Sequence, residues 1–246
     1  MSLIISSSGF SLPKDVSSIN QDSIMYPIES DDGYLLAVAD GVGGYNGGKE
    51  ASSSVISSLS TFGIIGSDID TIFERLKNVV KNLAKNNEDL RSAATTLTFC
   101  HISKRGIIIG HAGDCRLYFK NGNKLQQITK DHTQHQMLID EGYFTARELK
   151  NAQGKNVITS ALSSNLPLNY QSLFIPKDEL PLEEGYLVLY LMSDGAHSHW
   201  EKRPRFSPNT LGTPSRFASS LQKRIESKGP DDDYTLLAVK LSFAAA

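Results

Sequence analysis

Residues 96–128 read TLTFCHISKRGIIIGHAGDCRLYFKNGNKLQQI, and this stretch decides the fold class. It contains three short apolar segments, each of which predicts a β-strand: Thr96–Ile102, Ile107–His111 and Arg116–Phe119. Asn121-Gly122-Asn123 then predicts a hairpin loop. The segments between these strands are too short for helices, which favours antiparallel hairpins over a parallel βαβ sheet. We therefore expect an α+β layered domain with helices packed outside antiparallel strands.

Outward from this stretch, further strands and helices follow from the apolar pattern. Strands are predicted at Tyr34–Ala39, Tyr186–Met192 and Tyr234–Leu241. Helical spacing predicts helices over about 48–61, 68–86 and 214–227.

The ends of two helices carry capping signals. Ser67, followed by Asp70 three residues later, resembles a capping box, and Thr213 before Pro214 resembles an N-cap with proline in the first turn. Between 129 and about 182 the chain is mixed and mostly polar, with one short helical pattern at Gln134–Glu141. Long surface segments of this kind are often functional.

The composition is that of one globular domain, which we expect to span residues 1–246. Lys+Arg is 25 and Asp+Glu is 27, a net charge of −2, so no basic excess favours a nucleic-acid backbone. The longest apolar run is the seven residues Tyr186–Met192, far short of the roughly 20 that span a bilayer.

The N-terminus lacks the basic and apolar segments of a signal peptide. The two cysteines, Cys100 and Cys115, both sit among apolar residues and are expected to be buried free thiols in a reducing compartment. We therefore expect a cytoplasmic protein with no membrane or nucleic-acid partner.

Four separate strands each begin or end with an aspartate: Asp40, Asp114, Asp194 and Asp232. An Asp-Gly pair by itself is a turn signal, and turns alone remain one interpretation of these residues. Carboxylates that converge at one sheet edge repel each other unless a cation neutralises them. Oxygen-only ligands select a hard ion such as Mg²⁺ or Mn²⁺, and two such ions can hold a hydroxide and clamp a phosphoryl group.

The motifs around these aspartates follow a family order. They are Asn20-Gln21-Asp22-Ser23, Ala37-Val38-Ala39-Asp40-Gly41-Val42-Gly43-Gly44, Ala94-Thr95-Thr96-Leu97, Gly110-His111-Ala112-Gly113-Asp114-Cys115-Arg116, Thr129-Lys130-Asp131-His132-Thr133, Asn156-Val157-Ile158-Thr159-Ser160-Ala161-Leu162, Ser193-Asp194-Gly195 and Asp232-Asp233-Tyr234-Thr235. Together they resemble the metal-dependent protein serine/threonine phosphatases, the protein phosphatase 2C family, and the chain is similar to bacterial members over nearly its whole length.

The resemblance implies a four-layer αββα fold, a central antiparallel β-sandwich flanked by helices, with a flap over about 131–165. It also implies two Mn²⁺ or Mg²⁺ ions at one edge and a third, looser ion. Asp40 would bridge two ions, the Gly41 carbonyl would bind one of them, and Asp194 and Asp232 would bind the other.

In the same resemblance, Asp114 would serve the third ion together with Asp194, while Gln21 and Asp22 would hold metal-bound waters. The bridging hydroxide would attack the phosphorus of phosphoserine or phosphothreonine in a phosphorylated protein. Bacterial members usually oppose a Ser/Thr kinase, which implies a cognate kinase as a partner.

The sequence departs from the family pattern at three positions. Ser17 stands where the family usually carries a phosphate-binding arginine, and a hydroxyl does not replace a charged planar fork. Lys14 lies nearby and could substitute as a point charge. Val42 stands where eukaryotic members often have a histidine, and Asp233 replaces the usual asparagine. The extra charge of Asp233 would either tighten metal binding or repel substrate.

The missing arginine leaves a second function open, that of a catalytically weak, phosphatase-like regulatory binding module. The presence of all four metal aspartates favours the enzyme. His197 and His199 form an H-x-H pair, which can chelate zinc, but we interpret them as two exposed side chains of an irregular segment. We interpret His132 and His135 as surface residues near the flap. Lys202-Arg203-Pro204-Arg205 is interpreted as a solvated basic loop, with contact to an acidic partner as the alternative.

Overall fold

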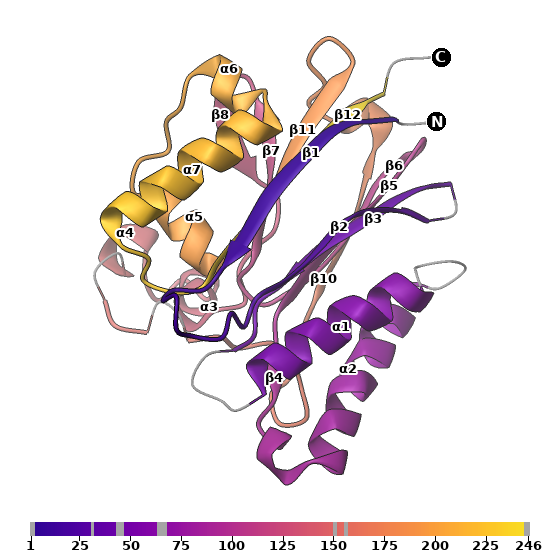
Figure 1. Cartoon of the computed structure of the whole chain (residues 1–246), viewed down its shortest axis with the longest axis vertical. Helices are drawn as coiled ribbons and strands as arrows, with labels where there is room; N and C mark the ends of the chain where they lie inside the picture. The colour runs from indigo at the N-terminus through magenta and orange to yellow at the C-terminus, as the bar shows by residue number, and fades with distance from the viewer. Residues whose placement is uncertain are drawn as a thin grey trace.

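The computed structural model describes residues 3–30, 32–42, 47–62, 68–149, 152–154 and 157–243. Within these residues, two five-stranded antiparallel sheets pack face to face (Figure 1). In spatial order, the first sheet consists of β1 (Leu3–Leu12), β12 (Tyr234–Ser242), β11 (Tyr186–Met192), β7 (Arg116–Asn121) and β8 (Lys124–Gln127). The second consists of β10 (Gln171–Pro176), β6 (Gly106–Ala112), β5 (Leu97–Ser103), β3 (Gly33–Ala39) and β2 (Ser23–Ser30). A small third sheet pairs β4 (Ala94–Thr95) with β9 (Leu162–Ser163).

Helices cover the outer face of each large sheet (Figure 1). On the second sheet lie α1 (Gly48–Phe62) and α2 (Ile69–Asn86), and on the first lie α5 (Asp194–Glu201), α6 (Pro208–Leu211) and α7 (Pro214–Lys228). The shorter α3 (Gln134–Asp140) and α4 (Ala146–Leu149) fall within the expected flap, and the 3₁₀ turns are η1 (Glu88–Leu90) and η2 (Lys177–Glu179). This arrangement confirms the α+β, four-layer αββα expectation.

Three apolar clusters hold the layers together. One lies between the second sheet and α1–α2, one between the two sheets, and one between the first sheet and α5–α7. The middle cluster is built from alternate residues of both sheets, such as Leu36 and Val38 on β3 and Leu189 and Leu191 on β11. Burial of apolar surface on both faces of each sheet is the main stabilising contribution to such a sandwich.

The decisive stretch 96–128 forms two hairpins in two different sheets. β5 pairs with β6 in the second sheet, and β7 pairs with β8 in the first. The predicted loop is confirmed, because Asn121 pairs with Lys124 and Gly122 adopts a positive φ of 58°. Between β6 and β7 the chain crosses from one sheet to the other, and Asp114 lies in this crossing.

The apolar pattern missed the edge strands β1, β2 and β10, and also the two-residue strands β4 and β9. β1 is rich in serine, and β2 contains Pro27 where its register with β3 shifts between Met25 and Ile28. Edge strands tolerate proline and polar residues because one side of the backbone has no ladder partner. Their apolar runs are therefore short, as in Ile24–Tyr26 of β2 and Leu173–Ile175 of β10, whereas the interior strand β11 has a run of seven.

The predicted helices are confirmed, with one change at a cap. Asp68, not Ser67, is the N-cap of α2, and its carboxylate accepts a hydrogen bond of 2.7 Å from the backbone N–H of Thr71. Ser67 lies outside the described residues, as do Gly43, Gly44 and Asn156 of the family motifs. None of the described helices is both long and apolar enough to cross a membrane.

Candidate metal centre

The predicted aspartates meet at one edge of the sandwich. Asp40 follows β3, Asp114 lies between β6 and β7, Asp194 begins α5 directly after β11, and Asp232 precedes β12. All four line one cavity of about 490 Å³. The tertiary structure thus brings together side chains that lie up to 192 positions apart in the sequence, from Asp40 to Asp232.

The backbone of Asp40 is held by two threonines at the junction of β4 and β5. Its N–H donates to Thr96 Oγ1 at 3.0 Å, and its carbonyl accepts from Thr96 N at 2.8 Å and from Thr95 Oγ1 at 2.9 Å. These bonds fix the direction in which the Asp40 side chain leaves the sheet.

Gly41, which also lines this cavity, is packed too tightly for a side chain. A Cβ there would lie 2.5 Å from both the carbonyl carbon and oxygen of Gly48 and 2.9 Å from the carbonyl oxygen of Gln21. Its N–H donates to that same Gln21 oxygen at 3.2 Å. The close backbone approach ties the start of α1 and the residue before Asp22 to the end of β3.

Asp22 is almost completely buried beside the four predicted ligands. Its Oδ2 accepts a hydrogen bond of 2.8 Å from Ser193 Oγ, which in turn accepts one of 2.9 Å from Thr235 N. Its Oδ1 is buried without a hydrogen-bond partner. Burial, with smaller contributions from the charges of Asp194 and Asp233, raises the pKa of Asp22 to about 7.

The remaining carboxylates repel one another in the same way. The pKa of Asp40 is raised well above its usual range, and burial is the largest cause. The negative charges of four neighbouring aspartates raise it further: Asp22, Asp194, Asp114 and Asp232. Burial and the charge of Asp194 likewise raise the pKa of Asp114, whose Oδ1 is also buried without a partner. A cluster of acids with orphaned buried oxygens is a site that a divalent cation would stabilise.

The donor set fits a hydrated hard cation. Among the described residues, no three His, Cys, Asp or Glu side chains are already gathered into a metal cage. Mg²⁺-type ions keep several waters and use only one or two carboxylates each. Separated carboxylates, a backbone carbonyl and polar side chains around a water-accessible cavity are therefore the arrangement such ions require.

Asp233 was expected either to tighten metal binding or to repel substrate, but the structure shows a different role for its carboxylate. Its carboxylate accepts hydrogen bonds from the backbone N–H groups of Lys14, at 2.8 Å, and Gln21, at 2.7 Å. It thereby clamps both ends of the loop from Lys14 to Gln21, and this loop forms one wall of the cavity. Lys14 lines the cavity, whereas Ser17 is exposed and absent from its lining.

The interpretation of His135, His197 and His199 as surface residues is wrong. His197 and His199 lie on α5 and are buried, and His197 Nε2 donates to the carbonyl of Asp114 at 3.1 Å. His135 is buried on α3. His132 is half-buried, and its Nδ1 accepts from Gly113 N at 3.1 Å. Two of these rings therefore support the Asp114 loop: His197, from helix α5, and His132, from the start of the expected flap.

Cys115 behaves as the sequence predicts. It is buried, and burial, together with the charge of Asp40, raises the pKa of its thiol well above the usual value. A thiol held protonated is not a nucleophile. Cys100 is likewise buried and free.

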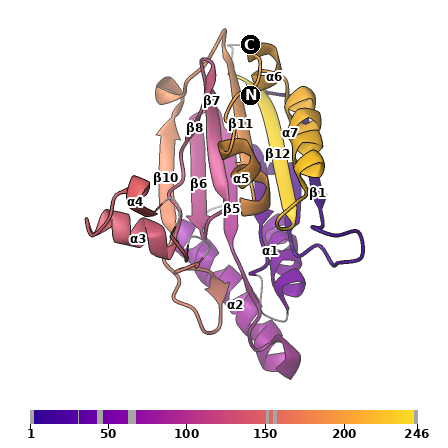
Figure 2. The same ribbon diagram turned by 90° about the vertical axis from the view of Figure 1, so that its left-hand side faces the viewer.

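The expected flap, with α3 and α4, lies to one side of α5 (Figure 2), and its two ends are joined to each other. Thr133 bridges to Ile158, and His132 N donates to the carbonyl of Gly113 at 2.7 Å. Arg116 holds Asp131 through a 2.6 Å ion pair and also pairs with Glu201 of α5. Between α3–α4 and α5 lies a second cavity of about 520 Å³, whose lining again includes Asp114, Asp194 and Asp232.

The chain is similar in sequence to known proteins over most of its length. The model of the family described as "Protein phosphatase 2C" matches residues 14–241. The chain is 32% identical over 137 residues to the serine/threonine protein phosphatase PstP of Mycobacterium tuberculosis, a match that covers 53% of the chain and 27% of PstP. It is 26% identical over 217 residues to the serine/threonine phosphatase stp of Listeria monocytogenes, covering 84% of each. The match to PstP thus spans little more than a quarter of that protein's length.

Solved structures show the same fold. The crystal structure of Mycobacterium tuberculosis PstP/Ppp superposes with a TM-score of 0.79 at 26% identity, covering 98% of this chain and 100% of that one. The PstP catalytic domain in complex with two manganese ions gives a TM-score of 0.72 at 24% identity, covering 97% and 99%. Since the family match spans most of the sequence and the fold agrees, this chain belongs to the protein phosphatase 2C family.

Proposed function

We propose that this chain is a Mg²⁺- or Mn²⁺-dependent phosphatase that hydrolyses phosphoserine and phosphothreonine in proteins. The observation that carries the proposal is the convergence of four aspartates around one cavity: Asp40, Asp114, Asp194 and Asp232. Asp22 is buried beside them, and one carboxylate oxygen each of Asp22 and Asp114 is buried without a partner. Family membership and the serine/threonine phosphatase names of the relatives support it.

The residues present would hold the cations as follows. Asp40 would bridge two ions, with the Gly41 carbonyl on one of them and Asp194 and Asp232 on the other. Asp114, with Asp194, would hold a third, and Gln21 and Asp22 would orient coordinated waters. When bound, the ions supply an activated water and neutralise the phosphoryl charge. PstP, a relative, binds two manganese ions in its crystal structure, which supports this assignment.

The chain's own residues prepare this site before any cation or substrate binds. Thr95 and Thr96 orient the Asp40 backbone, and Ser193 fixes one oxygen of Asp22 so that its other oxygen stays available. Rigid, pre-positioned carboxylates avoid reorganisation during the reaction. Buried His197 holds the carbonyl of Asp114 in place.

Lys14 is the candidate for contact with the substrate phosphate. It lines the cavity with Asp40 and Asp194, and Asp233 holds its backbone. A lysine contributes a point charge without the two-pronged geometry of arginine. We therefore expect a weak substrate affinity, consistent with Ser17 in the position of the family arginine.

The substrate class implies the partners. Phosphoserine and phosphothreonine in proteins are products of protein kinases, so a cognate Ser/Thr kinase must supply the substrate. We place this exchange in the cytoplasm.

The second candidate function is a regulatory binding module with little turnover, which the serine at position 17 favours. One experiment distinguishes the two functions. Hydrolysis of an aryl phosphate and a phosphothreonine peptide is measured in Mn²⁺, with EDTA and Asp194→Asn as tests and Asp89→Asn, an exposed residue of η1, as a matched control.

The enzyme predicts activity that EDTA and Asp194→Asn abolish and Asp89→Asn leaves unchanged. A folded protein whose unfolding temperature rises in Mn²⁺ but which hydrolyses neither substrate is instead the binding module. If Mn²⁺ neither activates nor stabilises the wild type, the assignment of the metal site is wrong as well.

A further inference from the structure

A strongly basic groove lies on the outer side of the first sheet, between α7 and the segment that joins α5 to α6. Its volume is about 770 Å³. We call it the basic groove and define it by its cationic side chains: Lys202, Arg203, Arg205, Lys223, Arg224 and Lys228. Asp231 is the carboxylate in its lining.

Arg224 lines the groove and holds its walls together through its guanidinium group. Its guanidinium donates to the carbonyls of Arg203, at 2.7 Å, and Arg205, at 3.0 Å. It also lies 4.1 Å from the centre of the Phe206 ring and 5.8 Å from that of Trp200. These contacts pin the 203–206 loop to α7, so the surrounding cations are held in position on an ordered surface.

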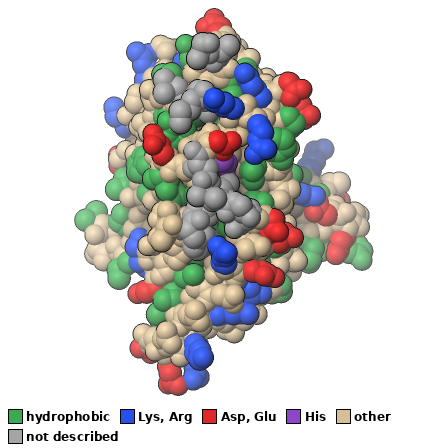
Figure 3. All heavy atoms as spheres, turned by 90° about the vertical axis from the view of Figure 1, so that its right-hand side faces the viewer, with side chains coloured by type: hydrophobic (Ala, Val, Ile, Leu, Met, Phe, Trp, Pro, Cys, Tyr) green, Lys and Arg blue, Asp and Glu red, His purple; other side chains and the backbone are tan. Residues whose placement is uncertain are grey.

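The positive charge of the groove is poorly compensated. Lys202 pairs with Asp231 at 2.9 Å, but in the part of the chain that the structure describes, the side chains of Arg203, Arg205, Lys223 and Lys228 form no ion pair. Burial, and then the charge of Arg203, lowers the pKa of Arg224, which agrees with a local excess of positive charge. On the opposite side of the molecule, acidic and basic side chains are interspersed (Figure 3).

The groove adjoins the 520 Å³ cavity beside the candidate metal centre. Lys202 and Asp231 line both the groove and the 520 Å³ cavity, and that cavity shares Asp114, Asp194 and Asp232 with the 490 Å³ cavity. In Figure 2, α5 stands between α3–α4 on one side and α7 on the other. A peptide that is bound at the aspartates and extends along α5 would reach the groove at the Lys202–Asp231 ion pair, which borders both cavities.

We propose that the basic groove binds an anionic segment of the substrate protein, on one side of the phosphorylated residue and several residues from it. The proposal rests on the proposed phosphatase function. The shared chemistry of the ligand is a row of anionic groups, supplied either by Asp and Glu side chains or by a second phosphorylated residue. Because the aspartate-lined cavity attracts cations and repels carboxylates, a separate basic surface gives an acidic substrate a place to dock.

The test uses phosphothreonine peptides of one composition in which a block of three glutamates is moved along the chain. The block lies two, four, six or eight residues before or after the phosphothreonine, since an extended residue spans about 3.3–3.6 Å. A neutral peptide and one carrying a second phosphothreonine in place of the block complete the set, and the second phosphate separates the two sources of charge. An aryl phosphate, too small to reach the groove, reports the basal chemistry.

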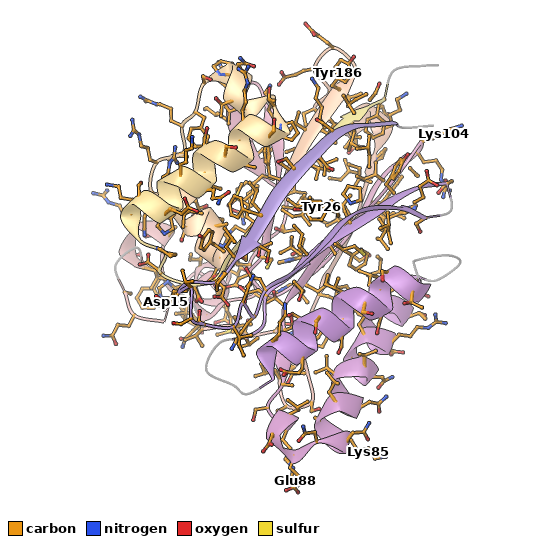
Figure 4. All side chains as sticks on the ribbon, in the orientation of Figure 1. Asp15, Tyr26, Lys85, Glu88, Lys104 and Tyr186 are labelled. Atoms are coloured by element: carbon orange, nitrogen blue, oxygen red, sulfur yellow. The ribbon has the colours of Figure 1, made fainter. Side chains whose placement is uncertain are left out.

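The test variant is Arg203→Ser/Arg205→Ser/Lys223→Ser. Arg224 bonds to the backbone carbonyls of 203 and 205, so these substitutions leave the loop anchored. The matched control removes three cations of α2, Lys77→Ser/Lys81→Ser/Lys85→Ser, and Lys85 lies at the far tip of the molecule (Figure 4). Thermal unfolding shows that each variant is folded.

For the wild type we expect kcat/KM to be roughly tenfold higher when the block lies on one side at one spacing, because each exposed ion pair contributes a factor of a few. Raising the salt concentration should reduce this preference. The test variant should lose it and keep its aryl phosphatase activity, while the control keeps both. The proposal fails if the wild type shows no positional preference, or if the preference survives in the test variant or disappears equally in the control.

A separate measurement of peptide binding tests the basic groove independently of phosphatase activity. The anisotropy of a fluorescent, unphosphorylated acidic peptide should rise on binding to wild type and not to the test variant. Absence of hydrolysis with intact binding contradicts the proposed function alone. If a short DNA duplex binds the groove as tightly as the acidic peptide, the groove is a general polyanion surface and the proposal is wrong.

Discussion

Ser193 Oγ donates a 2.8 Å hydrogen bond to Oδ2 of Asp22, across 171 residues of sequence. Asp22 precedes β2 at one edge of the second sheet, and Ser193 follows β11 in the interior of the first. The same serine accepts from Thr235 N at 2.9 Å, so one hydroxyl joins the two sheets at the edge where the aspartates meet. The hydrogen bonds of the Ser193 hydroxyl therefore both align the two sheets at this edge and position the carboxylate of Asp22.

Ser193→Ala should destabilise the fold, because both the Asp22 oxygen and the Thr235 N–H would lose a buried partner. We expect a loss of about 1–3 kcal/mol in the free energy of unfolding, measured in urea. Ser53→Ala, on the exposed face of α1, should change it by less than about 0.5 kcal/mol. Equal effects of the two substitutions would show that the Ser193 bridge contributes nothing.

Stability should depend on pH through Asp22. Its pKa, raised to about 7 by burial, exceeds the ordinary 3.8, so between about pH 4 and 7 the folded protein binds a proton that the unfolded chain has released. In EDTA, this contribution to stability is present below about pH 4 and is lost as the pH rises through 7.

The quantity to compare is the free energy of unfolding of wild type minus that of Asp22→Asn. The difference is needed because other groups titrate in the same pH range. Burial lowers the pKa of His111 to about 3, which acts in the opposite direction in both proteins. The stability of wild type minus that of the variant should fall from pH 4 to 7 in EDTA, and saturating Mn²⁺ should reduce or reverse the trend. A difference independent of pH would contradict the raised pKa.

Asp233→Ala should release both ends of the loop from Lys14 to Gln21. We expect a higher KM and a loss of about 1–3 kcal/mol of stability, because two backbone N–H groups lose a charged acceptor. Asp233→Asn keeps one acceptor oxygen and should fall between Ala and wild type. If Asn instead equals wild type in KM and in stability, the charge at this position has no role.

Lys14→Ala should raise KM for an aryl phosphate by about two- to fivefold, as removal of one exposed charge does, with little change in kcat. Lys104→Ala, at the other end of the sheets from Asp15 (Figure 4), is the control. An unchanged KM would exclude Lys14 from the substrate site.

Gly41→Ala should impair cation binding, although the substitution adds only a methyl group and removes no metal ligand. The new Cβ would meet the Gly48 carbonyl at 2.5 Å, which forces the backbone beside Asp40 to move. The rise in unfolding temperature produced by Mn²⁺ should shrink or vanish. Gly212→Ala, where the nearest atom lies at 3.4 Å, should retain the full rise. Retention of the rise in Gly41→Ala would remove its carbonyl from the proposed ligand set.

Interior strands and long amphipathic helices were predictable because their apolar spacing reflects burial on known faces. β11 was predicted with the bounds it has, and α2 and α7 to within a few residues. Edge strands were missed because one unpaired side permits serine and proline. Helix α5 was missed because it is only eight residues long, and its burial depends on packing against the first sheet.

By itself the sequence determined the element types, the family motifs and the four aspartates at strand ends, because periodicity and turn chemistry are local. The tertiary structure decided which long-range partners those residues meet. The Asp233 clamp joins residues 212 and 219 positions apart, and the basic groove joins the 202–205 loop to the face of α7. Local pattern does not encode such pairings, because they exist only once the two sheets have packed and brought their edges into register.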